Sequence, residues 1–248
     1  MDAPADKTYR RRVRAGDLVG FEVRVRETDL WIGADTDLSE TARDLVLQVR
    51  RPLEAYLVSH PGFLEALHPV PDDLLAPPIV REMMRDARPA GVGPMAAVAG
   101  VIAEQVGRGL LAWTSQVIVE NGGDVFLSLD RDATVTVFAG DSPLSDRIGI
   151  RIPARQMPVG VCSSSGTVGH SLSLGKTDAV CVVAESSGLA DSTATALGNR
   201  IRKRSDLEEA AEWVSGVQGV TGVVMILGKH LAAWGDVELT DMHPGQGK

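Results

Sequence analysis

Alternating apolar and charged positions near the start of the chain predict a pair of strands. Phe21, Val23 and Val25 alternate with charged residues, which is the pattern of a strand with one face in water. A polar pair of residues follows, and a second short strand is predicted over residues 29–32. We therefore expect the chain to begin with a strand pair.

The residues that follow predict helices. Asp37 and Glu40 have the spacing of an N-cap and capping-box pair, and we expect Pro52 to end or kink the helix that they begin. Five prolines between residues 59 and 78 predict an irregular connection, and a further helix is predicted over residues 79–86.

A row of small residues marks the next predicted helix. Pro94 suits its first turn, and Ala96, Gly100, Ala103 and Gly107 recur at intervals of four, three and four residues. Because this face has almost no side chains, the helix backbone can approach a sheet, another helix or a ligand closely.

Short apolar and β-branched runs predict that the second half consists mostly of strands. The predicted strands are 117–119, 125–129, 134–138, 148–152, 179–183, 223–227 and 237–240, with helices over 191–201 and 206–214. Because strands come in hairpin-like groups followed by helices, the predicted fold class is α+β, with antiparallel sheets packed with helices. The repeated strand–strand–helix order predicts one domain over residues 1–248 with two similar halves, about 1–115 and 116–248.

Composition and charge narrow the range of functions. The chain has 25 Lys and Arg against 33 Asp and Glu, a net charge of −8, and only 4% aromatic residues, which disfavours nucleic acid as a partner. No apolar run reaches the roughly 20 residues that span a bilayer, and the N-terminus lacks a signal-peptide pattern, so we expect no membrane partner and a cytoplasmic location. Two cysteines, Cys162 and Cys181, predict neither a disulfide framework nor a four-sulfur zinc site.

Three segments carry the candidate chemistry, and the first joins two predicted strands. Asn121 and Gly122 form a strong hairpin signal, and Gly123 and Asp124 extend it into a polar corner with exposed backbone. Two interpretations stay open: a simple turn, or a surface that binds ribose hydroxyls or a base edge.

The second segment, residues 160–171, is rich in glycine and hydroxyl side chains. Backbone N–H groups in such a loop can converge on an anion, as phosphate-binding loops do, although neither a P-loop nor a GxGxxG pattern is present. The residues assigned to phosphate or cofactor binding here are Ser163, Ser164, Ser165, Gly166 and Thr167.

The same segment holds two candidate catalytic residues. His170 is a ligand contact or a proton carrier, or else a hydrogen-bonded structural residue. Cys162 would become a nucleophile if converging N–H groups lowered its pKa, and otherwise it is an inert buried cysteine.

The third segment carries a candidate metal site. Asp191 suits the N-cap of the predicted helix. If that helix begins one residue earlier, Asp191 and Thr195 lie four residues apart on one face. A carboxylate and a hydroxyl there would supply two oxygen ligands to Mg²⁺, which keeps some water and binds substrate phosphate.

In this order, the segments resemble the uncharacterised ApbE-like family, a cytoplasmic relative of the FAD:protein FMN transferases. The resemblance is carried by ETDL at 27–30, GVGPMAAVAG at 91–100, ENGGD at 120–124, AGDSPLS at 139–145, GVCSSSGTVGHSLSLGK at 160–176 and residues 189–199. The Gly-Gly-Asp turn and the Thr-Ser-Gly loop of the transferases are similar to residues 122–124 and 164–166. Their Ala-Asp-x-x-x-Thr helix, which supplies the magnesium-binding Asp and Thr, is matched by Ala190, Asp191 and Thr195.

The resemblance implies a T-fold-like architecture with a ligand cleft between two similar halves. It also implies Mg²⁺, a flavin (FAD or FMN) or another nucleotide as cofactor, and a homo-oligomer. The chain departs from the transferases in two places. GPMAAVAGVIAE lacks the lysine of their Gly-x-x-Lys-Gly helix, and no Asp-Pro follows His170 as in their His-x-x-Asp-Pro segment.

The leading hypothesis is therefore a cytoplasmic protein that binds a phosphate-bearing, flavin-like or nucleotide-like small molecule, with transferase activity left open. An alternative is sulfur transfer on Cys162, and another is a non-catalytic assembly partner. The leading hypothesis requires Ser165 and Asp191 to converge around one cavity.

Overall fold

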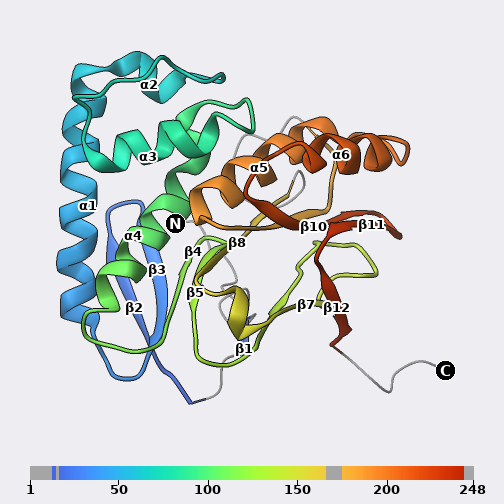
Figure 1. The fold of residues 1–248 in the computed structure, drawn as a ribbon, viewed down its shortest axis with the longest axis horizontal. Helices are drawn as coiled ribbons and strands as arrows, with labels where there is room; N and C mark the ends of the chain where they lie inside the picture. The colour runs from blue at the N-terminus through green and yellow to red at the C-terminus, as the bar shows by residue number, and fades with distance from the viewer. Residues whose placement is uncertain (1–12, 15–16, 166–174, 243–248) are drawn as a thin grey trace, which may run out of the picture.

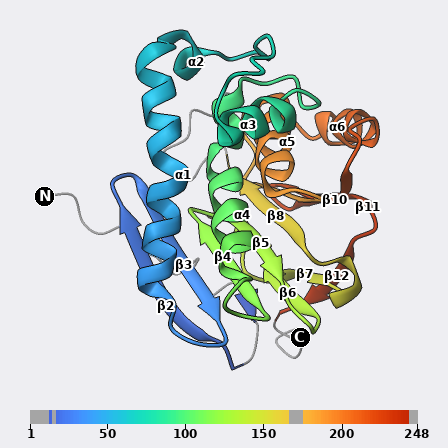
Figure 2. The ribbon, with the colours of Figure 1, turned by 60° about the vertical axis from the view of Figure 1, so that its left-hand side comes forward.

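The structure, a computed structural model, describes residues 13–14, 17–165 and 175–242. These residues form three layers, in which helices cover one face of an eight-stranded sheet and a four-stranded sheet covers the other (Figures 1 and 2). Every strand pairing in the described part is antiparallel. The predicted α+β class with antiparallel sheets is confirmed.

The large sheet combines strands from both parts of the sequence. In spatial order its strands are β11 (His230–Gly235), β10 (Val220–Leu227), β9 (Ala179–Ala184), β8 (Val159–Ser164), β5 (Asp124–Ser128), β4 (Val117–Asn121), β3 (Thr28–Ala34) and β2 (Val19–Val25). The small sheet has the order β1 (Val13–Arg14), β6 (Ala133–Thr136), β7 (Ile148–Ile152) and β12 (Glu238–Asp241). Since β3 pairs with β4, the two parts share one continuous sheet. The internal duplication stays a prediction.

The helices lie on one face of the large sheet. They are α1 (Ser39–Ser59), α2 (Pro61–Glu65), α3 (Pro78–Ala87), α4 (Val98–Leu110), α5 (Ser187–Arg200) and α6 (Asp206–Ser215), with the short 3-10 helix η2 (Pro94–Ala97). A second 3-10 helix, η3 (Ala154–Gln156), lies in the connection from β7 to β8. Helices α1 and α4 pack over one part of the sheet and α5 and α6 over the other, while α3 packs against α1, α4 and α5 (Figure 2). Within the described residues, no helix has the length and apolar character needed to cross a membrane.

The period-two geometry of the strands separates the core into layers. Phe126 packs against the helices, whereas its neighbours Val125 and Leu127 face the small sheet. The same alternation separates the cysteines, because Cys162 belongs to the helix side and Cys181 to the side of the small sheet. Both cysteines are free and buried.

Several predicted boundaries are wrong, and packing explains them. Helix α1 continues through Pro52, because Ala42, Val46 and Leu53 form one buried face on both sides of it. The prolines between residues 59 and 78 do not prevent the short helix α2. Strands β8 and β11 were not predicted at all. The sequence of β8 resembled a loop, because glycine and serine are common in loops and glycine is uncommon in strands.

Candidate functional site

A tight hairpin presents the first predicted segment at the end of two strands. It joins β4 to β5, with positive φ at Gly122 (68°) and Gly123 (112°), which explains why glycine occupies both positions. Glu120 Oε1 accepts a hydrogen bond of 2.7 Å from the backbone N–H of Gly123. The hairpin prediction is confirmed, and the turn places Asn121 and Asp124 opposite each other.

Strand β8 brings the second segment next to this hairpin. Asp124 pairs with Cys162, and the backbone N–H of Ser163 donates to the carbonyl of Gly123 at 3.2 Å. Ser163 is exposed, whereas Ser164 and Ser165 are half-buried. The strand ends at Ser164, so the serines lie at the same sheet end as the hairpin. Of the other predicted residues in this segment, Gly166, Thr167 and His170 lie outside the described residues.

Helix α5 brings the third segment to the same place. Ser187, its first residue, fits between α4 and β8 because both neighbours are glycines there. A Cβ on Gly100 would lie 2.2 Å from the Ser187 carbonyl oxygen, and one on Gly160 would lie 2.4 Å from Ser187 Cα. On the small-residue face of α4, Gly100 therefore serves close packing against α5, which fixes the position of Asp191, and Gly107 serves close packing against Phe126 of β5.

Asp191 lies in the second turn of α5, so the N-cap interpretation is wrong. Ser186 caps the helix instead, and its hydroxyl accepts a hydrogen bond of 3.2 Å from the Leu189 N–H. Asp191 Oδ2 accepts a hydrogen bond of 3.0 Å from the Gly100 N–H, near the start of α4. Thr195 follows one helical turn later and is half-buried, on the same face as Asp191.

Two carboxyl groups, Asp124 and Asp191, thus meet below the hairpin. Burial raises the pKa of Asp124 well above its usual range, and the negative charge of Asp191 raises it further. Burial also raises the pKa of Asp191 to about 7, although hydrogen bonds from the N–H groups of Gly100 and Ala99 partly oppose this shift. Because the negative charge of one acid opposes ionisation of the other, the two cannot both ionise easily without a compensating cation or a bound proton.

The pair suits a divalent cation in one further respect. Asp124 is 9% exposed, and its Oδ1 atom is buried with no hydrogen-bond partner in the described part of the chain. Carboxylate oxygens are the ligands that Mg²⁺ prefers. The described residues contain no group of three or more His, Cys, Asp or Glu side chains that could hold a metal. A cation here would therefore keep water or ligand oxygens, which is usual for Mg²⁺ bound with phosphate.

Cys162 lies beside this pair but is poorly suited to act as a nucleophile. It is fully buried, and its Sγ lies 3.2 Å from the Ser187 carbonyl oxygen, to which the thiol donates. Burial raises the pKa of Cys162 well above that of a free thiol, and the negative charges of Asp124 and Asp191 add to the shift. The lowered pKa that the sulfur-transfer hypothesis needs is the opposite of what this environment produces.

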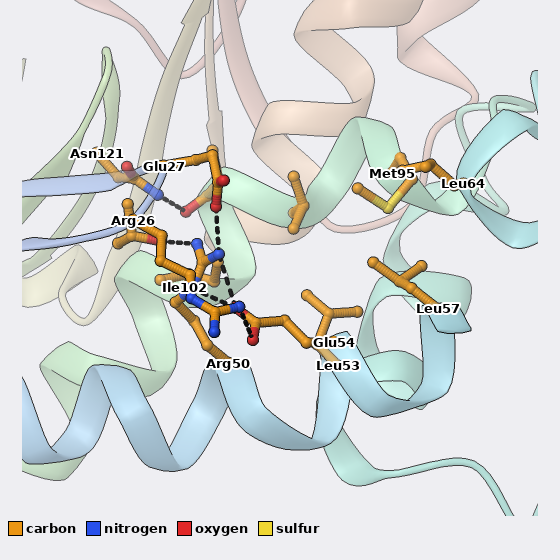
Figure 3. A pocket seen from close by; sticks show the side chains of 13 residues that line it. Arg26, Glu27, Arg50, Leu53, Glu54, Leu57, Leu64, Met95, Ile102 and Asn121 are labelled. Atoms are coloured by element: carbon orange, nitrogen blue, oxygen red, sulfur yellow. Dashed lines mark hydrogen bonds and ion pairs between the residues drawn. The ribbon is translucent and has the colours of Figure 1, made fainter. Parts of the chain in front are cut away.

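A pocket of about 450 Å³, which the sequence did not predict, opens next to the hairpin (Figure 3). Charged side chains and Asn121 line one end, and Leu57, Leu64 and Met95 line the other. Asn121 Nδ2 donates a hydrogen bond of 3.1 Å to the Ala99 carbonyl, so the pocket wall includes the start of α4. Its lining comes from the β2–β3 turn, α1, α2 and α4, which only the tertiary fold brings together.

A second cavity of about 580 Å³ lies between α3, α4 and the start of α5. Two of its acids, the buried Asp86 and the half-buried Glu104, are already bonded to the protein. Asp86 accepts hydrogen bonds from Arg85 Nε at 2.7 Å and from Ser186 Oγ at 3.0 Å. Glu104 Oε2 accepts one of 2.7 Å from the Ser187 N–H. Because acids near a helix N-terminus stabilise it, these groups explain how α5 is anchored.

Comparison with solved structures identifies the class of fold. The flavin transferase ApbE from Vibrio cholerae (H257G mutant) superposes with a TM-score of 0.57 at 14% identity, over 88% of this chain and 98% of that chain. The ApbE protein from Thermotoga maritima gives 0.55 at 12% identity, over 88% and 97%. At these identities the comparison shows a shared fold, and the protein has an ApbE-like architecture.

Sequence comparison gives the family. Residues 10–216 match the family described as AbpE bacteria. A UPF0280 protein from Methanocella arvoryzae is 39% identical over 86% of both chains, and one from Methanosarcina acetivorans is 37% identical over 96% of this chain and 94% of its own. The chain belongs to this ApbE-like family. The family resemblance found in the sequence is confirmed.

Proposed function

We propose that this protein binds a phosphate-bearing small molecule, a flavin or another nucleotide, together with Mg²⁺ at the Asp124–Asp191 pair. The observation that carries the proposal is the interaction of two carboxyl groups: Asp124 is buried, with an Oδ1 atom that lacks a partner in the described residues, and the half-buried Asp191 raises its pKa through its negative charge. Burying such a pair destabilises a protein unless a cation or a proton compensates it.

In this proposal, each part of the site has a separate task. Asp191 and Asp124 hold the metal, with Thr195 one helical turn away as a further oxygen ligand. The serines at the end of β8, including Ser163, contact phosphate, and Asn121 contacts the remainder of the ligand. Bound Mg²⁺ would neutralise phosphate charge and orient the phosphate group.

The fold supports a flavin-related activity as the reaction class, because the superposed protein from Vibrio cholerae is a flavin transferase by description. That the protein also transfers a flavin group is a more specific proposal than ligand binding. The missing lysine in residues 94–105 and the missing Asp-Pro segment leave binding better supported than turnover.

The Asp191→Asn variant tests the proposal by thermal denaturation. Asparagine can still accept the hydrogen bond from the Gly100 N–H, so the fold should survive, but it is a poor ligand for Mg²⁺. Ligand at about a hundred times its Kd should stabilise the native protein by about 2.7 kcal/mol. We expect FAD, FMN or ADP with Mg²⁺ to stabilise the native protein in this way. Asp191→Asn should lose the part of this stabilisation that requires Mg²⁺.

The Asp44→Asn variant is the matched control, because it removes the same charge from an exposed position on α1. It should respond like the native protein. No stabilisation of the native protein by any of the three nucleotides with Mg²⁺ would contradict the proposal.

A further inference from the structure

The pocket beside Asn121 is the strongest feature that the proposed phosphate and metal chemistry leaves unused. We infer that it binds an uncharged, apolar group of the same ligand whose phosphate lies at the Asp124–Asp191 pair, an inference that rests on the proposed function. This assigns a specificity site to residues of α1, α2 and α4.

The pocket and the carboxyl pair share one short stretch of backbone. The Ala99 carbonyl accepts the hydrogen bond from Asn121 on the pocket side. The next residue, Gly100, donates its N–H to Asp191 on the carboxyl side. Since both contacts fall on consecutive residues of α4, one ligand of nucleotide size can reach both places.

The charges at the polar end of the pocket compensate one another. Arg50 is the central residue, with a side chain only 12% exposed. It donates to Glu54 Oε1 at 3.0 Å and to Thr28 Oγ1 at 2.6 Å, and it forms an ion pair with Glu27. Arg26 forms an ion pair with Glu54 as well (Figure 3).

This network opposes a charged ligand group inside the pocket. The lining has two arginines and two glutamates, which together carry no net charge. A second phosphate would have to compete with Glu27 and Glu54 for the largely buried Arg50, and the negative charges of these two carboxylates would repel it. The part of the ligand that enters should therefore be uncharged.

The other end of the pocket is an apolar space between two helices. Leu53 and Leu57 of α1 are separated by one helical turn, and so are Val98 and Ile102 of α4. Leu64 of α2 closes this end and is 56% exposed. Covering such side chains stabilises a complex by about 25 cal/mol per Å² of buried apolar surface. A fused ring or an isoprenyl chain has the required chemistry.

Adjacent residues on α1 offer a matched pair of variants. Leu57 lines the pocket, whereas its neighbour Val58 is 86% exposed and does not. Leu57→Phe should fill the pocket and Val58→Phe should leave it open. The affinities of FMN, geranyl phosphate and ribose 5-phosphate would be measured with Mg²⁺ by calorimetry for the native protein and both variants.

We expect FMN, geranyl phosphate or both to bind the native protein and Val58→Phe at least about tenfold tighter than ribose 5-phosphate does, since burying an apolar group contributes more than 1.4 kcal/mol. If FMN has this higher affinity, the pocket accepts a fused ring, and if geranyl phosphate has it, the pocket accepts an isoprenyl chain. In Leu57→Phe this advantage should fall to about threefold or less. An unchanged affinity of Leu57→Phe for ribose 5-phosphate would show that the variant is folded.

Other outcomes separate the two proposals. If Leu57→Phe keeps the full advantage, the pocket is not the apolar site, while magnesium-dependent binding of ribose 5-phosphate still supports the proposed function. If FMN and geranyl phosphate gain nothing over ribose 5-phosphate in the native protein, the inference is also overturned. If none of the three ligands binds the native protein, both proposals fail.

Discussion

Asp191 accepts a hydrogen bond from the backbone N–H of Gly100, a residue 91 positions earlier in the chain. The contact joins helices α5 and α4 and directs the carboxyl group toward the hairpin that carries Asp124. The contact stabilises the start of α4, because N–H groups in the first turn of a helix lack partners within the helix. It also holds an acid where burial and a second acid oppose its ionisation.

The carboxyl pair should make the metal-free protein less stable as the pH rises. The pKa of Asp191 is raised to about 7 in the folded protein, so unfolding releases protons between the unfolded value and 7. The free energy of unfolding, measured with urea in a chelator, should therefore fall between about pH 4 and pH 7. In Asp191→Asn the fall should be smaller by at least about 1 kcal/mol. Parallel pH profiles for the two proteins would show that the carboxyl group is not perturbed.

Asp35 should have the opposite pH dependence. It accepts hydrogen bonds from Thr114 Oγ1 at 2.8 Å, from the Ser115 N–H at 2.9 Å and from Ser115 Oγ at 2.7 Å. These bonds, first those from the Ser115 and Thr114 hydroxyls, lower its pKa to about 2. The stabilisation is present above the unfolded value and is lost as the pH falls through about 2.

Asp35→Asn should thus lower the free energy of unfolding by at most about 1 kcal/mol at pH 7, because Asp35 is exposed and water screens its charge. The difference from the native protein should shrink below pH 4, where the native carboxylate begins to take up protons. Denaturant unfolding at pH 7 and pH 3 measures both values. A difference that is the same at both pH values would exclude the carboxylate as its source.

Cys162 should react slowly with iodoacetamide in the native protein. Its burial and the neighbouring acids raise its pKa, so thiolate is scarce and access is blocked. Cys181, on the opposite face of the sheet, has a pKa raised to about 11 by its burial and should behave alike. Mass spectrometry after timed alkylation at pH 7.5 would follow both, with protein in denaturant as the fully reactive control. Native Cys162 that reacts as fast as a model thiol would revive the sulfur-transfer alternative.

Gly100→Ala should destabilise the fold, because the added Cβ would lie 2.2 Å from the Ser187 carbonyl oxygen. Backbone must move on one side or the other, so we expect a loss of about 1–3 kcal/mol in the free energy of unfolding. Gly62→Ala is the control, since nothing lies within 4 Å of its added Cβ, and it should change stability by less than about 0.5 kcal/mol. Equal melting temperatures for the two variants would contradict the close packing of α4 and α5.

The sequence predicted the local elements well where pattern and turn chemistry agree. The alternation at Phe21, Val23 and Val25 identified β2, and Asn121-Gly122 identified the β4–β5 hairpin. It failed where tertiary packing overrides local preference. Pro52 lies inside α1, and in β8 the strand preference of Val159 and Val161 is masked by the glycine and serines around them.

By itself, the sequence determined the α+β class, the family and the residue types of the candidate site, because these depend on periodicity, turn residues and motifs. Only the tertiary structure decided that Asp124 and Asp191 meet, since their encounter depends on Gly100 and Gly160 admitting the first turn of α5. It also decided the environment of Cys162 and the pocket between α1 and α4. Burial and charge proximity belong to the folded chain, and no local pattern encodes them.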